Sequence, residues 1–488
     1  MMVVIIILVA VSYLIAMQSV TAMVEQRQRV TRKVLKQAKQ ALLAYAQTRA
    51  DQQIPSPQPG RYGYLPCPAN NNSEGISTGS CGSRYLNALG WFPWKSLDMP
   101  VLKDGNGNCL LYAVSSTYKW SPDAKMLNED SPGMLQLVDE SGAVIQGTAA
   151  SGRIVAMVFS AGQALAGQAR INNANSECGY DTSNFGAYLD TYTLPSGSVI
   201  NNSTVSSQPN HVDPFIHIAS AAQKDAVNDQ LLTITRDDIW LPIMRRGEFD
   251  DANTSKTNKI RRLTEALARC LASYANDNNT HRLPLPAPLD LSSNGYRDNN
   301  HYTDISSGSY IGHYPFITSA ADSIIPGTLA TTKLFEKPFT LGQPCNSLPL
   351  SLPGNGTPAN LRDSHALERQ LWDNWKDHIF YAVSKIYAPS SSATMAACGD
   401  CIKVKGIKYA AAVIYSGQKL SGHIPPQIRQ TPIAAMDIGV VADSKNNLAN
   451  YIEVNNPAGT GKGDYTRTAN DTVFCLTDTN PVGVVSCM

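Results

Sequence analysis

The sequence has almost no excess of charge, since 40 Lys and Arg stand against 39 Asp and Glu, which leaves a net charge of +1 over 488 residues. Proteins that bind nucleic acid usually carry a basic face, so this balance argues against a nucleic-acid partner. Charged residues are also few, at 16%, whereas hydrophobic residues make up 43%. That composition is typical of a globular body and argues against a largely disordered chain.

Charge is missing altogether from residues 1–24, and neither Gly nor Pro occurs before Pro55. Residues 25–48 then continue a helical pattern in which apolar side chains recur every three to four positions on one face. These apolar positions are Val30, Val34, Ala38, Ala41, Leu42 and Tyr45. We therefore expect one long N-terminal helix of about 70 Å. Residues 1–24 would be its transmembrane or filament-core half, and residues 25–48 an amphipathic spine for a first head.

Metal-binding patterns are scarce, although ten cysteines are present. Cys398 and Cys401 form a CxxC, but no second CxxC or His pair stands at zinc-finger spacing. An even number of cysteines behind an apolar N-terminal segment favours an oxidising compartment and disulfides, with zinc or redox chemistry as the competing interpretation. We predict disulfides between Cys67 and Cys81 and between Cys398 and Cys401. The other six cysteines cannot be paired from the sequence.

The most informative pattern is an internal repeat, because similar segments recur in the same order in both halves of the chain. The matching segments are 41–46 with 270–275, 65–69 with 283–287, 90–94 with 312–316, 104–118 with 373–387, 158–167 with 413–422, 187–190 with 450–453, and 228–235 with 470–477. This period is far longer than that of a solenoid, so we interpret it as a domain duplication. We expect a first head over 25–250 and a second over 251–488, with its own helix at 258–276.

Each half reads as a helix followed by short strands, which predicts an α+β fold with the helix packed on an antiparallel sheet. The segments at 104–118 and 373–387 are both expected to be a polar turn that enters a strand. The residues that repeat most clearly are expected to be structural, and they are Asp104, Tyr112, Gly162, Gln163, Asp373, Tyr381, Gly417 and Gln418.

These features resemble the type IV pilin and type II secretion pseudopilin superfamily. The resemblance rests on the apolar start Met2-Val3-Val4-Ile5, the long helix, and the turn and strand at 104–112. The Leu-Pro-Cys-Pro-Ala segment at 65–69 and Gly-Trp-Phe-Pro-Trp at 90–94 are similar to a prepilin-type subfamily. The resemblance covers the N-terminal helix and both repeats. It implies a protein that assembles with other pilin-like subunits through the N-terminal helix.

The N-terminus departs from the family pattern. No leader ending in Gly precedes the apolar segment, and the usual Phe at the mature start and the Glu four residues later are missing. Either the sequence as given begins downstream of the true start, or the processing site has been lost. The basic flank at 27–39 would stay in the cytoplasm under the positive-inside rule, whereas the cysteines favour export, and a basic leader would reconcile the two.

Few residues suggest chemistry. Ser77 lies in a G-x-S-x-G pattern at 75–79, but an Asn-rich loop precedes it where a nucleophile elbow needs a strand. Asp104, Asn106 and Asn108 have the oxygen spacing of the start of a calcium loop, yet Cys109 stands where Gly is required and Ser115 where Glu is required. A polar turn is favoured over calcium, and no cofactor, metal site or enzymatic activity is expected.

The sequence thus predicts a structural minor pilin or pseudopilin of a type IV pilus or type II secretion apparatus. It would be a single-pass inner-membrane protein with a periplasmic head, which could become extracellular in a pilus. The alternative is a membrane- or pilus-displayed adhesin that binds a surface ligand through the second head. That head carries a Pro-, Gly- and Ser-rich insertion over 325–359.

Overall fold

The chain forms two compact units. The computed structural model describes residues 2–51, 61–69, 74–120, 126–149, 152–170, 177–178, 184–218, 226–249, 258–277, 282–291, 296, 302–304, 309–318, 332–333, 366–389, 401–420, 427, 429, 445–452, 463–465 and 470–487, without the side chains of 2–21, 318, 332–333, 366–370 and 463–465. The first unit contains Met1–Arg49, Gly63–Asp123 and Pro132–Ile239. The second contains Ala50–Tyr62, Ala124–Ser131 and Trp240–Met488. Most of the insertion at 325–359 lies outside the described residues.

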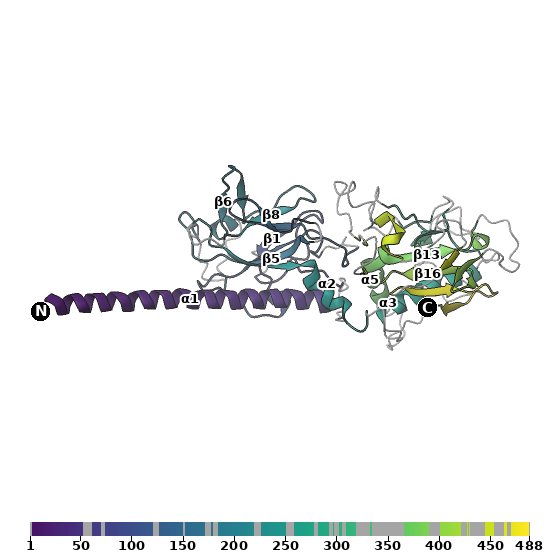
Figure 1. Cartoon of the computed structure of the whole chain (residues 1–488), viewed down its shortest axis with the longest axis horizontal. Coiled ribbons are helices and arrows are strands. Elements are labelled where there is room, and N and C mark those ends of the chain that lie inside the picture. Colours follow the sequence, from purple (N-terminus) through teal and green to yellow (C-terminus); the bar gives the residue numbers. More distant parts are fainter. Residues whose placement is uncertain are drawn as a thin grey trace. The chain divides into compact units, whose positions relative to one another are not determined.

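The first unit is built on α1, which runs without a break over Met2–Thr48 (Figure 1). Its packed stripe consists of Leu35, Ala38, Leu42 and Ala46, which are fully or almost fully buried. The stripe faces β5 (Ile154–Ser160) and β9 (Gln230–Thr235). The predicted stripe is partly wrong, because Val34, Ala41 and Tyr45 are only half-buried at its margins.

The part of α1 before this stripe leaves the sheet. Side chains 22–27 are exposed, and they include Met23 and Val24 at 57% and 46% exposure. Lys39, inside the stripe region, donates to the Asp238 carboxylate at 3.0 Å and to the Thr233 carbonyl at 2.9 Å, which ties α1 to β9. Over the part of the chain searched, namely the described residues, no helix is both long enough and apolar enough to cross a membrane.

The sheet of the first unit is mixed. Its order is β1-β2-β5-β3-β4, with β9 paired to β5 and β8 paired to β3. The pair β3–β8 is parallel, so the prediction of a purely antiparallel sheet is wrong for this unit. A long connection after β5 carries a separate hairpin, β6–β7, and returns the chain beside β3. The remaining bounds are β1 Ala88–Trp91, β2 Leu111–Val114, β3 Leu135–Val138, β4 Val144–Gln146, β6 Thr191–Thr193, β7 Val199–Asn201 and β8 Asp213–Ile216.

The division between the units falls within helix α2 (Arg236–Met244). The second unit has its own helix, α3 (Lys259–Asp277), close to the predicted 258–276. Asn258 caps it, because the Arg261 N–H donates to Asn258 Oδ1 at 2.8 Å. Helix α3 lies against β16 and β18 of a sheet in the order β10-β13-β16-β18-β19. The bounds are β10 Ile311–His313, β13 Ile379–Val383, β16 Ala411–Tyr415, β18 Thr472–Leu476 and β19 Val484–Ser486.

Smaller elements complete the second unit. Helix α5 precedes β13, and two small sheets, β11-β12 and β15-β14-β17, lie outside the main one. Their bounds are α5 Ala366–Trp375, β11 Ile317–Thr318, β12 Thr332–Lys333, β14 Ile402–Val404, β15 Ile407–Tyr409 and β17 Gly463–Tyr465. The described 3-10 turns of this unit are Lys376–His378, Lys385–Tyr387 and Leu448–Asn450, those of the first unit are Lys95–Leu97 and Phe185–Ala187, and a further one, Arg49–Asp51, follows α1.

The main sheets of the two units share a strand register across their central strands. In each unit, four residues on four neighbouring strands pair side by side. In order across the sheet they are a Gly, a buried Tyr, a Val and an apolar residue. The rows are Gly90–Tyr112–Val158–Leu232 and Gly312–Tyr381–Val413–Phe474. A one-residue slip would turn every side chain of a strand to the opposite face, so this agreement is a specific structural similarity.

The two units differ before the Tyr-bearing strand. Asp104 lies in a turn as expected, but Asp373 lies near the end of helix α5. The prediction of a polar turn at 373 is therefore wrong. Trp372 and Trp375 bury almost all of their surface on one side of α5. Burial of such large aromatic side chains stabilises a helical turn in a segment whose sequence also suits a loop.

Replacing Leu42 by Ala should destabilise the first unit by about 2–5 kcal/mol, because a fully buried leucine leaves a cavity against the sheet. Urea unfolding followed by circular dichroism would measure the change in free energy of unfolding. Gln40→Ala, on the exposed side of the same helix, is the matched control and should change it little. Equal effects of the two substitutions would contradict the packing described here.

Candidate functional site

The two repeated tyrosines each connect a strand of the main sheet to a proline-containing segment earlier in the chain. Tyr112 and Tyr381 are fully buried. The Tyr112 hydroxyl donates to the Pro66 carbonyl at 3.2 Å, and the Tyr381 hydroxyl donates to the Pro284 carbonyl at 3.1 Å. In both units the buried phenol thus donates a hydrogen bond to the backbone carbonyl of an upstream proline. Their predicted structural role agrees with these contacts.

The repeated Gly-Gln pairs lie in turns where another segment of the same unit passes very close to the glycine. Gly162 has φ +59°, and a Cβ there would lie 2.6 Å from Asn228 Oδ1. The Asn228 amide donates to the Gln163 carbonyl at 2.7 Å. In the second unit a Cβ at Gly417 would lie against the backbone carbonyl oxygen of Asn470, whose side-chain amide donates to the Gln418 carbonyl. Only glycine fits at the first position, so these residues fix the end of the central strand.

An arginine clamp, half-buried in the first unit and buried in the second, follows this turn, and the sequence analysis missed it. Arg170 donates from Nη1 to the Gly162 carbonyl at 2.8 Å, from Nε to the Ala187 carbonyl at 3.0 Å and from Nη2 to Gln168 Oε1 at 3.0 Å. Its guanidinium also lies over the Tyr188 ring, 5.4 Å from the centroid. One planar side chain therefore joins the strand end to a distant segment of the same unit.

Arg429 makes the corresponding contacts in the second unit. It donates to the carbonyls of Gly417 and Asn450, to Gln427 Oε1 at 3.0 Å and to the Tyr451 carbonyl at 3.1 Å. Its guanidinium lies 4.9 Å from the Tyr451 ring centroid. The sequence does contain Gln-x-Arg in both halves, at 168–170 and 427–429. The loops before these motifs differ in length, so the two motifs do not align without a gap.

The loop around Asp104 is a polar turn. Asp104 Oδ1 accepts the backbone N–H groups of Asn106 at 2.8 Å and Asn108 at 2.9 Å, and Oδ2 accepts the Ser160 hydroxyl at 2.7 Å. Both carboxylate oxygens thus face hydrogen-bond donors rather than the further oxygens that a calcium ion requires. The Gly105 N–H donates to Thr31 Oγ1 at 3.0 Å, so the turn also binds α1.

Asp373, its predicted counterpart, has another role. It forms an ion pair with Arg61, with 3.2 Å between Arg61 Nη2 and Asp373 Oδ2, and both side chains are largely buried. The ungapped sequence match therefore joins residues with different partners.

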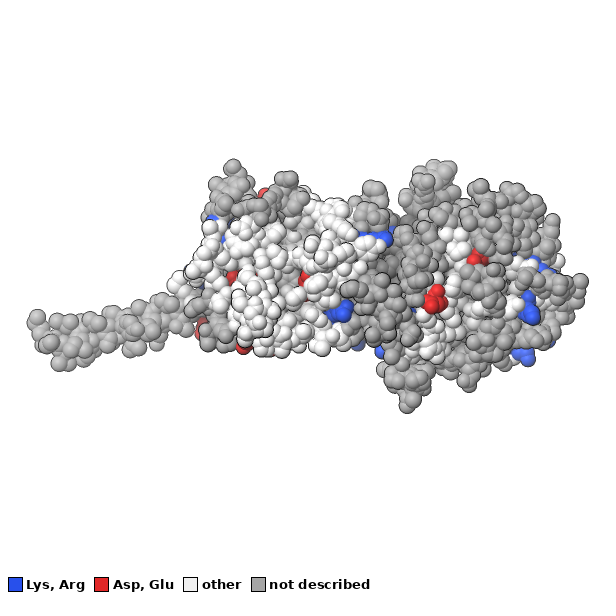
Figure 2. Space-filling view, turned by 90° about the horizontal axis from the view of Figure 1, so that it is seen from above, with Lys and Arg blue, Asp and Glu red and all other residues white. Residues whose placement is uncertain are grey.

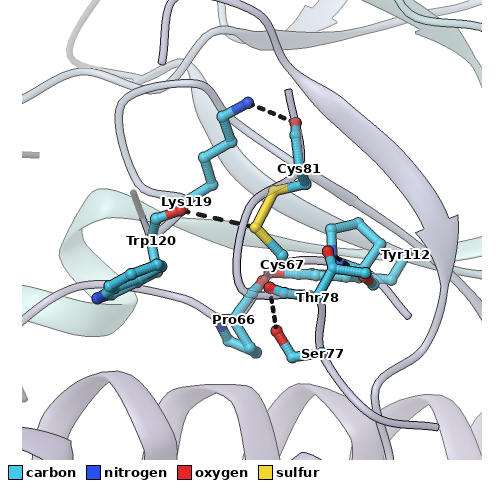
Figure 3. The surroundings of a disulfide bond; sticks show 9 residues. Pro66, Cys67, Ser77, Thr78, Cys81, Tyr112, Lys119 and Trp120 are labelled. Atoms are coloured by element: carbon cyan, nitrogen blue, oxygen red, sulfur yellow. Dashed lines mark hydrogen bonds between the residues drawn. A yellow bond between two sulfur atoms is a disulfide. The ribbon is translucent and has the colours of Figure 1, made fainter. Parts of the chain in front are cut away.

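The predicted disulfide between Cys67 and Cys81 is present, with the two Cα atoms 5.7 Å apart (Figure 3). Lys119 donates from Nζ to the Cys81 carbonyl at 2.8 Å, and burial lowers the pKa of this Lys to about 8. Disulfides also join Cys109 with Cys178 and Cys475 with Cys487. Cys401 and Cys270 are disulfide-bonded as well. Cys398 lies outside the described residues, so its pairing with Cys401 stays a prediction.

Ser77 does not lie in a nucleophile elbow. Residues 74–82 form turns and an isolated bridge from Ser77 to Ala69, with neither a strand before Ser77 nor a helix after it. The Ser77 hydroxyl donates to the adjacent Thr78 carbonyl at 3.3 Å, and its N–H donates to Ser96 Oγ at 2.8 Å. Both contacts are those of a loop serine, and neither would activate a nucleophile.

The second unit contains a buried ion cluster that the sequence analysis also missed, formed by Asp130, Asp377, His378 and Lys445. Lys445 Nζ contacts Asp377 Oδ2 and lies 3.3 Å from Asp130 Oδ2. His378 Nε2 lies 3.0 Å from Asp130 Oδ2. The side chains of Lys445 and Asp377 are 0% exposed, and that of Asp130 is 7% exposed. No sequence spacing brings these residues together, because they come from three separate segments.

The charges in this cluster stabilise one another. Burial opposes the charged form of Asp130, but Lys445 and His378 hold the pKa of its carboxyl well below the usual range. Burial likewise opposes the charged form of Lys445, but Asp377 raises its pKa above the ordinary value. Ligand atoms of Asp130, Asp377 and His378 lie within 4.8 Å of one another, a spacing suited to a metal ion. The Lys445 ammonium, however, already supplies a cation to both carboxylates.

A carboxylate pair, Asp190 and Asp229, lies in the first unit. The Asp190 N–H donates to Asp229 Oδ2 at 2.9 Å, and the Asp229 N–H donates to Asp190 Oδ2 at 3.1 Å. Burial and then the charge of Asp190 raise the pKa of Asp229 well above its ordinary value, and burial raises the pKa of Asp190. Asp229 Oδ1 has no hydrogen-bond partner among the described residues. The pair therefore favours a proton on Asp229.

Comparison with family models, with curated proteins and with solved structures finds no match to this chain.

Replacing Arg170 or Arg429 by Lys should destabilise the corresponding unit by about 2 kcal/mol or more, because Lys keeps the charge but cannot bond several carbonyls at once. Denaturant unfolding would measure the change in free energy of unfolding. Arg32→Lys, at an exposed position of α1, is the control and should have little effect. If all three substitutions behaved alike, the clamps would not support the fold.

Asp229→Asn should stabilise the first unit more at about pH 8 than at about pH 4. A raised folded pKa gives stability that is complete below the unfolded pKa of about 3.9 and is lost as pH rises through the folded value. Asn imitates the neutral acid and does not titrate. Denaturant unfolding at both pH values would measure the difference, with exposed Asp98→Asn as control. If the difference in free energy of unfolding between the variant and the wild type does not grow with pH, the pKa of Asp229 is not raised.

Proposed function

We propose that the chain is a structural subunit of a pilin-like assembly, namely a minor pilin or pseudopilin of a type IV pilus or type II secretion apparatus. The observation that carries the proposal is the continuity of α1 over Met2–Thr48. Its C-terminal half is part of the core of the first unit, and its side chains 22–27 are exposed beyond that core. The uncharged residues 2–24 thus belong to a helix that is built into a folded head.

A continuous helix suits a subunit that is positioned by its apolar end. Neither Gly nor Pro interrupts α1, so the apolar segment and the head are joined by the helix itself rather than by a flexible linker. In this arrangement, packing of residues 1–24 against neighbouring apolar helices also sets the position of the first head. Exposed Met23 and Val24 extend the apolar surface of the helix toward the head.

The proposal includes a duplicated head. Its support is that both units have the same central strand register, the same Tyr-to-Pro hydrogen bond and the same arginine clamp. A duplicated head is larger than a packed shaft subunit usually carries, which favours a minor, tip-located or initiating role. The disulfides favour a head that folds in an oxidising compartment such as the periplasm.

The surface gives no support to a nucleic-acid partner. On the face that Figure 2 shows, the described Lys, Arg, Asp and Glu side chains lie in small scattered groups rather than in one basic field. With the net charge of +1, this favours protein and membrane partners over polyanions.

Placing two lysines in the apolar segment, as Ile6→Lys with Val9→Lys, should release the protein from the membrane, because each charge costs about 2.5–3.5 kcal/mol at a helix centre in a bilayer. Gln26→Lys with Gln28→Lys adds the same charge outside the apolar segment and is the matched control. Alkaline extraction of cell membranes, followed by immunoblotting of pellet and supernatant, would compare the two with wild type.

The same cells would test assembly. A photo-crosslinking residue at Val11 should give adducts with other pilin-like subunits, and the double-lysine variant should lose them. Wild-type protein in the supernatant, or the absence of any such adduct, would overturn the proposal. If removal of residues 255–488 leaves the adducts but abolishes attachment to surfaces, the second unit acts as an adhesin.

A further inference from the structure

We propose that Lys445 and Asp377 form an intramolecular amide bond, in which Lys445 Nζ is joined to the side-chain carbonyl carbon of Asp377. The bond would link two segments of the second unit that are 68 residues apart in the chain. This inference is independent of the proposed function, because it concerns the interior of one unit only.

The two reacting groups are already in contact inside the protein. Lys445 Nζ contacts Asp377 Oδ2, and both side chains are 0% exposed. The Lys445 amine lies over the ring of Tyr451, 5.4 Å from its centroid. Holding an amine and a carboxyl together in a dry site replaces an encounter in solution by an intramolecular step, which accelerates bond formation strongly.

Asn128 is placed to polarise the carbonyl group under attack. Its amide nitrogen donates to Asp377 Oδ1 at 2.8 Å, and the same nitrogen lies 3.0 Å from the Asn374 carbonyl. Its own Oδ1 accepts the Asp130 N–H at 3.0 Å, which fixes the orientation of the amide. A fixed donor at this oxygen stabilises the negative charge that develops there when the amine adds.

Asp130 is placed to move the proton. Its Oδ2 lies 3.3 Å from Lys445 Nζ and 3.0 Å from His378 Nε2, which holds the carboxylate in position. It can accept a proton from the amine and return it to the oxygen that leaves Asp377. The charge network makes this transfer uphill, but a bond that forms once per molecule requires only a slow step.

The reaction balances without a further reagent. The Lys445 ammonium gives a proton to Asp130 and a second proton to the carboxyl of Asp377, and Nζ forms a bond to Cγ of Asp377. The C–O bond to Oδ2 breaks, and Oδ2 leaves as water with the protons that the ammonium lost. No group is oxidised or reduced. The product replaces a buried ion pair, whose desolvation is costly, by a neutral amide.

Intact-mass measurement of the purified full-length protein, after reduction and alkylation, tests the proposal directly. The mass should be lower by one water than that calculated for the alkylated chain, and tryptic digestion should give a branched peptide that joins Lys445 to Asp377. A mass equal to the calculated value, with normal cleavage after Lys445, would overturn the proposal and leave a buried ion pair.

Substitutions separate the roles. Asp130→Asn keeps both reacting groups and should slow bond formation roughly 100-fold or more, as expected for loss of a catalytic base. Glu265→Gln is the control, because Glu265 pairs with Arg269 on helix α3 and not with Lys445, Asp377, Asp130 or His378, and it should react like wild type. Asp377→Asn should lose ammonia instead of water, and Lys445→Arg should form no bond. If a variant fails to fold by circular dichroism, the wild-type mass alone still decides.

Discussion

The packing of an amphipathic helix against a sheet face is the interaction on which each unit depends. In the first unit Leu35, Ala38, Leu42 and Ala46 bury one side of α1 against β5 and β9. In the second, α3 lies against β16 and β18 in the same manner. In both units this packing removes the apolar stripe of the helix from water and covers one face of the sheet. In the first unit, this helix is also the one that carries the uncharged residues 1–24.

Burial of the sheet creates a second constraint, because carbonyl groups at strand ends must find donors. Both units meet it with the same device, an arginine that bonds the carbonyl of the strand-ending glycine and that of a distant turn. A guanidinium suits this role because it presents several donors in one plane and remains charged. The two units therefore share this arginine interaction as well as their strand order. The shared interaction supports the proposed duplication.

Much of the framework was predictable from local patterns. The uninterrupted apolar periodicity predicted α1, the repeat predicted a second helix close to α3, and the even number of cysteines predicted disulfides, of which Cys67–Cys81 is present. The polar turn at 373 was predicted wrongly, since the burial of Trp372 and Trp375 favours a helix there. The clamps and the buried ion cluster were missed, because their partners lie far apart in sequence and no local spacing marks them.

The sequence by itself determined the long helix and the central strands, and it indicated the repeat and the presence of disulfides, because periodicity, similarity between segments and cysteine content are properties of the chain alone. Only the tertiary structure decided that Arg170 and Arg429 are equivalent, that Asp229 faces Asp190, and that Lys445 lies between two carboxylates. Residues 130, 377 and 445 share no periodic relation. Their chemistry arises when burial removes water from around them and leaves the charges in contact with one another.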